Sequence, residues 1–219
     1  MIHCIGNSHA CLFSGSNVHP GCFHIWPQRN NFDQLPFFRT YSIGPAIAYY
    51  FYEHHHYKIL DIINNVHIPK TDSIMFCIGE VDCRWHIPFQ AKLQNRTIEE
   101  VIVECVQRYF QSLKEINNMG YKVMAWMAHP STIAGHNENP DSPVYETCQI
   151  RNEISCLFNN ELNKLCKQHG IYFLDIFKQL LDPVTGLTDM NYYIDYCHLD
   201  AIKTMPLIIE KLKRDKIIL

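Results

Sequence analysis

The chain has 219 residues, of which 47% are hydrophobic and 19% are charged. This composition excludes a disordered protein and is typical of a globular one, and the length suits one domain over residues 1–219. The formal net charge of −3 is too balanced to attract a polyanion, so no nucleic-acid partner is expected. No apolar run approaches the ~20 residues of a membrane-spanning helix.

The sequence contains ten cysteines, mostly inside apolar runs where a thiol behaves as a small hydrophobic group. The N-terminal residues show neither the basic region nor the long apolar core of a secretion signal. We therefore expect a cytoplasmic protein in a reducing compartment, and free thiols instead of disulfides.

The first ten residues predict a buried strand that ends in a sharp polar turn. An apolar run over residues 2–5 stops at Gly6, and Asn7-Ser8-His9 follow. In open parallel sheets, ligands bind outside the carboxyl ends of the strands, which makes Ser8 the first candidate catalytic residue. The alternative interpretation is ordinary turn chemistry, in which Ser8 caps the helix that follows.

The remaining chain predicts alternating strands and helices. Further strands are expected over residues 22–26, 73–78, 121–127 and 171–174, and the main helices over residues 45–57, 97–119, 144–169 and 201–213. Residues 28–39 and 131–143 are expected to be loops, the second lying over the site. Thr97 and Glu100 form a capping-box sequence. The alternation predicts an α/β fold: a parallel sheet with right-handed crossovers and helices on both faces.

Near the C-terminus, Asp195 precedes His198 by three residues. In a nucleophilic triad, a carboxylate orients one imidazole nitrogen while the other nitrogen faces a hydroxyl. Ser8 follows the first strand and the Asp–His pair follows the last, so a parallel sheet brings all three to one edge. Cys197 beside His198 is a weaker candidate nucleophile, because adjacent side chains diverge.

Other histidine-containing patterns do not predict a metal site. Cys83 and His86 have half of a zinc-site spacing, but no second ligand pair with matching spacing follows. The three consecutive histidines at 54–56 point in different directions on a helix. His129, at a strand end, is expected to form local hydrogen bonds. No metal and no cofactor are expected.

Four short blocks, in order, resemble the conserved blocks of the SGNH (GDSL-type) hydrolases. Residues 6–9 (Gly-Asn-Ser-His) resemble the first block, and Asp195-x-x-His198 resembles the last. Gly44 is similar to the glycine of the second block, and residues 78–84 (Ile-Gly-Glu-Val-Asp-Cys-Arg) are similar to the third. The resemblance implies a flavodoxin-like three-layer α/β/α sandwich with about five parallel strands.

For the site, the resemblance implies a triad of Ser8, His198 and Asp195, with the backbone N–H groups of Ser8 and Gly44 holding the oxyanion. It also implies a serine hydrolase that acts on acyl esters. The substrate suggested by analogy is a small acyl group, such as acetyl, on a carbohydrate or another small molecule, with hydrolysis or acyl transfer as the reaction.

Two positions depart from the family pattern. Asn7 stands where the family usually has Asp, and Val81 stands where an Asn side chain usually donates to the oxyanion. Arg84 could replace that donor, or it could form an ion pair with Glu80 or Asp82 that shapes the loop. Because valine cannot donate a hydrogen bond, the alternative function is a non-catalytic binding module that retains the fold.

Overall fold

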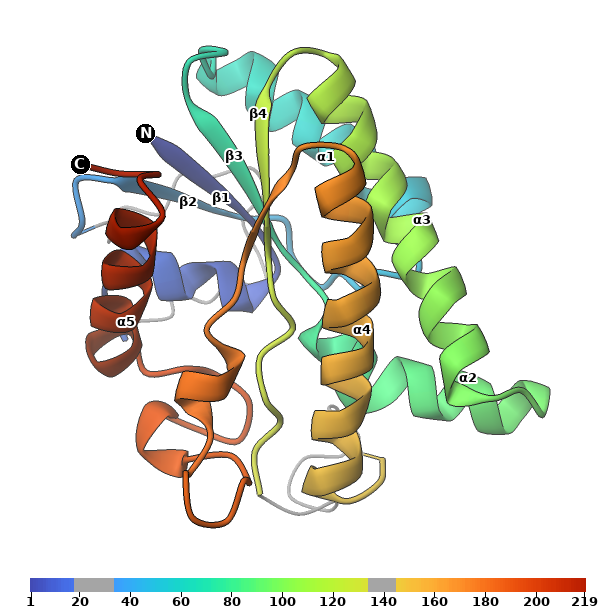
Figure 1. Cartoon of the computed structure of the whole chain (residues 1–219). Coiled ribbons are helices and arrows are strands. Elements are labelled where there is room, and N and C mark those ends of the chain that lie inside the picture. Colours follow the sequence, from blue (N-terminus) through green and yellow to red (C-terminus); the bar gives the residue numbers. More distant parts are fainter. Residues whose placement is uncertain (18–33, 134–144) are drawn as a thin grey trace.

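The computed structural model describes residues 1–17, 34–133 and 145–219. Its centre is one five-stranded sheet in the order β2-β1-β3-β4-β5, and all four strand pairings are parallel (Figure 1). The strands are β1 (Ile2–Gly6), β2 (Phe38–Ser42), β3 (Ser73–Cys77), β4 (Lys122–Trp126) and β5 (Tyr172–Leu174). The predicted parallel α/β sheet is confirmed.

Five α-helices are described: α1 (Phe51–Val66), α2 (Ile87–Gln94), α3 (Ile98–Asn118), α4 (Cys148–Gln168) and α5 (Ala201–Arg214). Helices α1, α3 and α4 cover one face of the sheet, and α5 covers the other together with a 3-10 helix at Ser8–Ser14 (Figure 1). The three-layer sandwich is therefore confirmed.

Alternation along the strands divides the core into two layers, one on each face of the sheet. In β3, Ile74 and Phe76 join the cluster formed with α1, α3 and α4, while Met75 and Cys77 join the cluster formed with α5. Strands buried on both faces are expected for a parallel sheet, and their apolar runs explain why the sequence predicted them.

The second described strand of the sheet was not predicted. The expected strand at 22–26 lies outside the described residues, and β2 is Phe38–Ser42, which overlaps the end of the expected loop at 28–39. Within the described part of the chain, β2 pairs with β1 and stands at one end of the sheet, and its buried residues are interspersed with polar ones such as Arg39. That mixed pattern, following Pro36, gave no clear strand signal.

The helix expected at 45–57 begins later, at Phe51. The backbone N–H groups of Ala48 and Tyr49 donate to the buried carboxylate of Asp82, at 2.7 and 3.1 Å, so this stretch is held as a loop. A distant carboxylate thus replaces the local hydrogen bonds that a helix would need.

Helices α3 and α4 start at local capping residues. Thr97 Oγ1 accepts from Glu100 N at 3.2 Å and Thr97 N donates to Glu100 Oε2 at 2.9 Å, which confirms the capping box. Helix α4 starts at Cys148, after its cap Thr147, and so later than the expected 144. No helix among the described residues is long and apolar enough to cross a membrane.

Candidate active site

The candidate site lies at the carboxyl ends of the parallel strands. β1 ends at Gly6, and a Cβ on this residue would lie 2.3 Å from the carbonyl oxygen of Cys77 at the end of β3. Only glycine allows the two strand ends to approach so closely. The chain leaving β1 therefore turns directly into Ser8, beside the segment that leaves β3.

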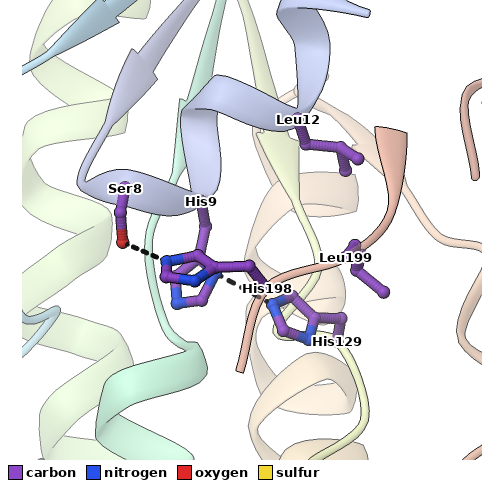
Figure 2. Close-up of a pocket in the computed structure, with 6 residues that line it drawn as sticks. All are labelled: Ser8, His9, Leu12, His129, His198 and Leu199. Carbon is purple, nitrogen blue, oxygen red and sulfur yellow. Dashed lines mark hydrogen bonds between the residues drawn. The ribbon is translucent and has the colours of Figure 1, made fainter. Parts of the chain in front are cut away.

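Ser8, His198 and Asp195 meet at this edge. Ser8 Oγ lies 2.9 Å from His198 Nε2 (Figure 2). On the other side of the ring, His198 Nδ1 lies 2.7 Å from Asp195 Oδ2. The second carboxylate oxygen of Asp195 accepts the backbone N–H groups of Cys197 and His198, at 2.8 and 2.7 Å. The predicted convergence of the three side chains is thus present in the structure.

The ionised state of Asp195 determines the direction of each hydrogen bond between Asp195, His198 and Ser8. Burial alone would raise the pKa of Asp195, but the bonds from His198 and from two backbone N–H groups outweigh it and hold the pKa far below its ordinary value. The ionised carboxylate accepts only, so His198 Nδ1 carries the proton. Nε2 is then free to accept the Ser8 hydroxyl proton, which is the arrangement a general base requires.

Asn7 takes part in positioning Ser8. Its side-chain oxygen accepts from His9 N at 3.1 Å, and its amide nitrogen donates to the carbonyl oxygen of Ala46, also at 3.1 Å. An aspartate could make the first bond but, being acceptor-only, could not make the second. The departure at Asn7 therefore ties the nucleophile turn to the loop before α1.

Gly44 lies in that same loop, with a positive φ of 79° that favours glycine. A Cβ there would meet no atom within 4 Å, so the backbone conformation and not crowding explains this glycine. Its N–H donates to Ser42 Oγ over 3.4 Å, a long bond. The role of Gly44 as an oxyanion donor stays a prediction.

Arg84 forms an ion pair with Glu80. Its Nε donates to Glu80 Oε1 at 2.8 Å and its NH2 group donates to Oε2 at 3.3 Å, and both side chains are buried. Of the two roles considered for Arg84, the structure shows the ion pair, with Glu80 and not Asp82 as the partner. Val81, between these residues, is half-buried and offers no side-chain donor.

Three residues that sequence reasoning left out of the site lie beside the triad: His9, Glu80 and His129. His129 Nε2 is 3.1 Å from His9 Nδ1, so its bonds are not merely local. The signal available for His9 was its place in the first block, directly after Ser8. The order of the strands placed Glu80 and His129 at the same edge as Ser8, but it did not show that their side chains would join those of His9 in one hydrogen-bonded chain.

A small cavity of about 10 Å³ opens beside Ser8 and His198, which is room for about one water molecule (Figure 2). It is lined by Ser8, His9, Leu12, His129, His198 and Leu199.

The potential metal ligands at this edge contact one another. Among the described residues, Asp195, Cys197 and His198 form a group whose ligand atoms lie within 4.8 Å. The hydrogen bond between Asp195 Oδ2 and His198 Nδ1 already engages one potential ligand atom of each of these two residues. Cys197 Sγ is 3.4 Å from His198 Nδ1, and burial raises the pKa of this thiol far above its usual value, so it does not offer a thiolate. At the Cys83–His86 pair, the His86 ring packs against Tyr49 instead.

The fold is shared with solved GDSL-like lipases and acetyl xylan esterases. A GDSL-like lipase from Bacteroides thetaiotaomicron matches 98% of this chain and 88% of its own, with a TM-score of 0.61 and 14% identity. A catalytic mutant of Axe2, an acetylxylan esterase from Geobacillus stearothermophilus, matches 97% of this chain and 92% of its own (TM-score 0.56, 12% identity). The acetyl xylan esterase AlAXEase matches 98% of this chain and 99% of its own, with a TM-score of 0.55 and 16% identity.

At these identities the likeness establishes the fold alone. No protein-family model matches the sequence, and no curated protein matches it either.

Proposed function

We propose that this protein is a serine hydrolase that cleaves acyl esters. The observation that carries the proposal is the hydrogen-bonded chain Ser8–His198–Asp195, with bonds of 2.9 and 2.7 Å at the edge of the sheet where ligands bind. A serine that merely capped a helix would need no imidazole on its hydroxyl. The esterase activity of proteins with this fold agrees with the proposal.

In the proposed reaction, Ser8 Oγ attacks the ester carbonyl carbon while its proton passes to His198 Nε2, and the carbonyl electron pair moves onto oxygen. The tetrahedral intermediate expels the alcohol, which takes the proton from His198. Water, or an acceptor hydroxyl for acyl transfer, then repeats the two steps on the acyl-enzyme. Asp195 orients His198 and stabilises the imidazolium in both halves.

We further propose that the acyl group is short, with acetyl on a carbohydrate or another small alcohol as the leading candidate. The acyl group would enter at the small cavity beside Ser8 and His198. Two of the structural neighbours above act as acetyl xylan esterases. Activity on nitrophenyl esters should therefore fall steeply from acetate to butyrate to octanoate.

The decisive experiment is labelling with a fluorophosphonate probe, which reacts with an activated serine. The wild-type protein should be labelled, and Ser8→Ala should abolish labelling. Ser14→Ala is a matched control, since Ser14 lies at the other end of the same 3-10 helix and is fully buried. A folded wild-type protein that resists the probe would overturn the proposal and favour a binding module that retains the fold.

A further inference from the structure

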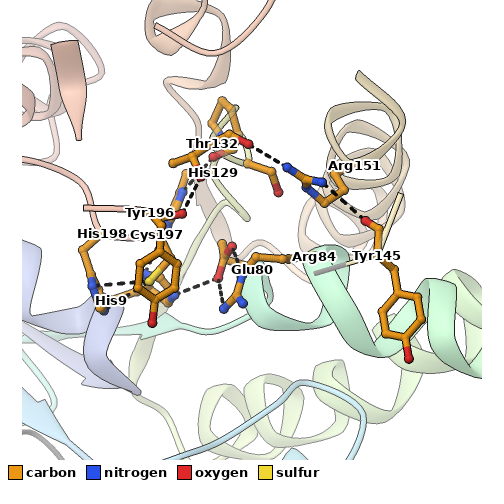
Figure 3. A network of polar contacts seen from close by, with 12 residues as sticks. His9, Glu80, Arg84, His129, Thr132, Tyr145, Arg151, Tyr196, Cys197 and His198 are labelled. Atoms are coloured by element: carbon orange, nitrogen blue, oxygen red, sulfur yellow. Dashed lines mark hydrogen bonds and ion pairs between the residues drawn. The ribbon is translucent and has the colours of Figure 1, made fainter. Parts of the chain in front are cut away.

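Behind the triad runs a second, fully enclosed chain of polar side chains (Figure 3). Arg84 pairs with Glu80, Glu80 Oε2 lies 2.9 Å from His9 Nε2, and His9 Nδ1 lies 3.1 Å from His129 Nε2. His129 Nδ1 is 3.2 Å from the hydroxyl of Tyr193. The five residues are between 1% and 7% exposed. Polar groups this deep are retained only when each has a partner.

The hydrogen bonds in this chain have a definite direction. Burial would raise the pKa of Glu80, but Arg84 and His9 hold it well below its ordinary value, so Glu80 is an ionised acceptor. His9 Nε2 therefore donates to it. Burial lowers the pKa of His9, so the ring is neutral and its Nδ1 accepts from His129 Nε2. The proton of the Tyr193 hydroxyl, finally, is shared between His129 Nδ1 and the carbonyl oxygen of Pro130.

The same chain is neutral overall. Glu80 and Arg84 cancel, and both histidines are uncharged, since burial followed by repulsion from His9 lowers the pKa of His129 to about 3. A neutral neighbour matters to a catalytic base, because a second positive charge beside it would oppose the charge it acquires from the serine.

The chain touches the triad at two points. His9 is covalently the next residue after Ser8, so a fixed His9 side chain anchors the nucleophile turn. The His9 ring also packs against the His198 ring, with centroids 5.1 Å apart and planes tilted by 41°. His9 and His129 form part of the wall of the cavity beside Ser8 and His198 (Figure 2).

We propose that the buried chain Arg84–Glu80–His9–His129–Tyr193 positions Ser8 and His198. His9 is the residue of this chain that contacts both of them. His9, locked by a bond at each ring nitrogen, holds the Ser8 turn on one side and supports the His198 ring on the other. Misplacing reacting groups by as little as 1 Å can cost about a hundredfold in rate. The inference rests on the proposed function, since it concerns the same site.

Two substitutions of His9 separate positioning from simple packing. His9→Phe retains a ring of similar size but removes both hydrogen bonds. His9→Gln retains one donor for Glu80 and one acceptor for His129, and it is uncharged. We expect His9→Phe to slow fluorophosphonate labelling about tenfold or more, and His9→Gln to restore most of the loss.

A second readout does not depend on catalysis. The proton on His198 Nδ1, bonded to Asp195, should give a far-downfield NMR resonance, assigned by its loss in Asp195→Asn. We expect this resonance in the wild type and in His9→Gln, and its loss or broadening in His9→Phe. If the wild type is not labelled at all, the proposed function fails, but the resonance still decides whether His9 orders His198.

The inference is overturned if His9→Phe keeps both the labelling rate and the sharp resonance and lowers only the melting temperature. Should His9→Phe fail to fold, Tyr193→Phe tests the far end of the chain with the loss of a single hydroxyl. Tyr193→Phe should also slow fluorophosphonate labelling and broaden the His198 resonance, but by less than is expected for His9→Phe. An unchanged Tyr193→Phe protein would then count against the chain as a positioning device.

Discussion

Ser8 Oγ and His198 Nε2 lie 2.9 Å apart although 190 positions separate the two residues in the sequence. The parallel sheet explains this proximity, because every strand ends at the same edge and each crossover returns the chain to the opposite one. Ser8 and His198 are therefore held by the whole fold, with Asp195 on the same loop as His198. The first prediction concerns this acid.

Replacing Asp195 with Asn should lower kcat by orders of magnitude with little change in folding stability. An amide would donate to His198 Nδ1, which leaves the proton on Nε2, so the ring could no longer accept from Ser8; in a serine protease this change costs about 10⁴-fold. Asp189→Asn is a suitable control, since Asp189 caps a short turn at Met190–Tyr192, a role that Asn also fills. Comparable losses in both variants would count against the assigned role of Asp195.

Introducing a hydrogen-bond donor in place of Val81 should raise kcat. An Asn there restores a side-chain donor for the oxyanion, and one such donor is worth about 2.7–4 kcal/mol in a well-studied protease. We expect Val81→Asn to raise kcat about tenfold or more while KM stays constant, as for an interaction made only in the transition state. Val81→Leu matches the size of Asn without the donor and should not raise kcat. A gain in the Leu variant would assign the effect to packing.

The Arg84–Glu80 pair should contribute to stability mainly by avoiding a lone buried charge. Arg84→Ala leaves the Glu80 carboxylate unpaired and should lower the free energy of unfolding in urea by about 3–5 kcal/mol. The double variant Glu80→Gln with Arg84→Gln should recover much of that loss, because no charge remains. If Arg84→Ala instead leaves stability unchanged and lowers kcat at constant KM, Arg84 is the missing oxyanion donor.

Acidification should destabilise the fold below pH 6.5. Burial lowers the pKa from 6.5 for six described histidines: His3, His9, His55, His56, His86 and His129. The unfolded chain therefore binds more protons, and their contribution to stability, present above 6.5, is lost as pH falls toward the folded values. Among the described groups, Asp82 opposes this effect, because burial raises its pKa to about 6.

Urea unfolding measured from pH 7 to pH 4 checks this prediction. Each histidine contributes up to about 1.4 kcal/mol per pH unit over its interval, which for His129 extends to about pH 3. His129→Gln carries no titrating group, so its stability should fall less steeply with acid than that of the wild type. Parallel curves for the two proteins would contradict the neutral state assigned to His129.

The thiols provide a test of the compartment we propose. Of the nine described cysteines, Cys156 is exposed while most are buried. In native protein purified without reductant, a thiol reagent should modify Cys156 first, and Cys156→Ser should remove that fast phase. In denaturant all ten thiols should react. Two or more missing thiols would show a disulfide and contradict a reducing environment.

The sequence by itself determined the elements whose signals are local. Apolar runs marked β1, β3, β4 and β5; β1, β3 and β4 lie inside the sheet, where burial on both faces requires apolar side chains. The capping box placed the start of α3. The short blocks around Ser8 and His198 identified the candidate triad, because each block is contiguous and its place after a strand fixes the edge of the sheet.

Tertiary structure alone decided what depends on contacts between distant segments. β2 was missed because its sequence, Phe-Arg-Thr-Tyr-Ser, mixes polar with apolar residues, and only the packed structure buries most of them. The stretch before α1 stayed a loop because Asp82, 34 positions from Ala48, captures its backbone N–H groups. Likewise, whether Arg84 faces the oxyanion or Glu80 depends on which buried charge lies within reach, and only the packed strand ends place that charge.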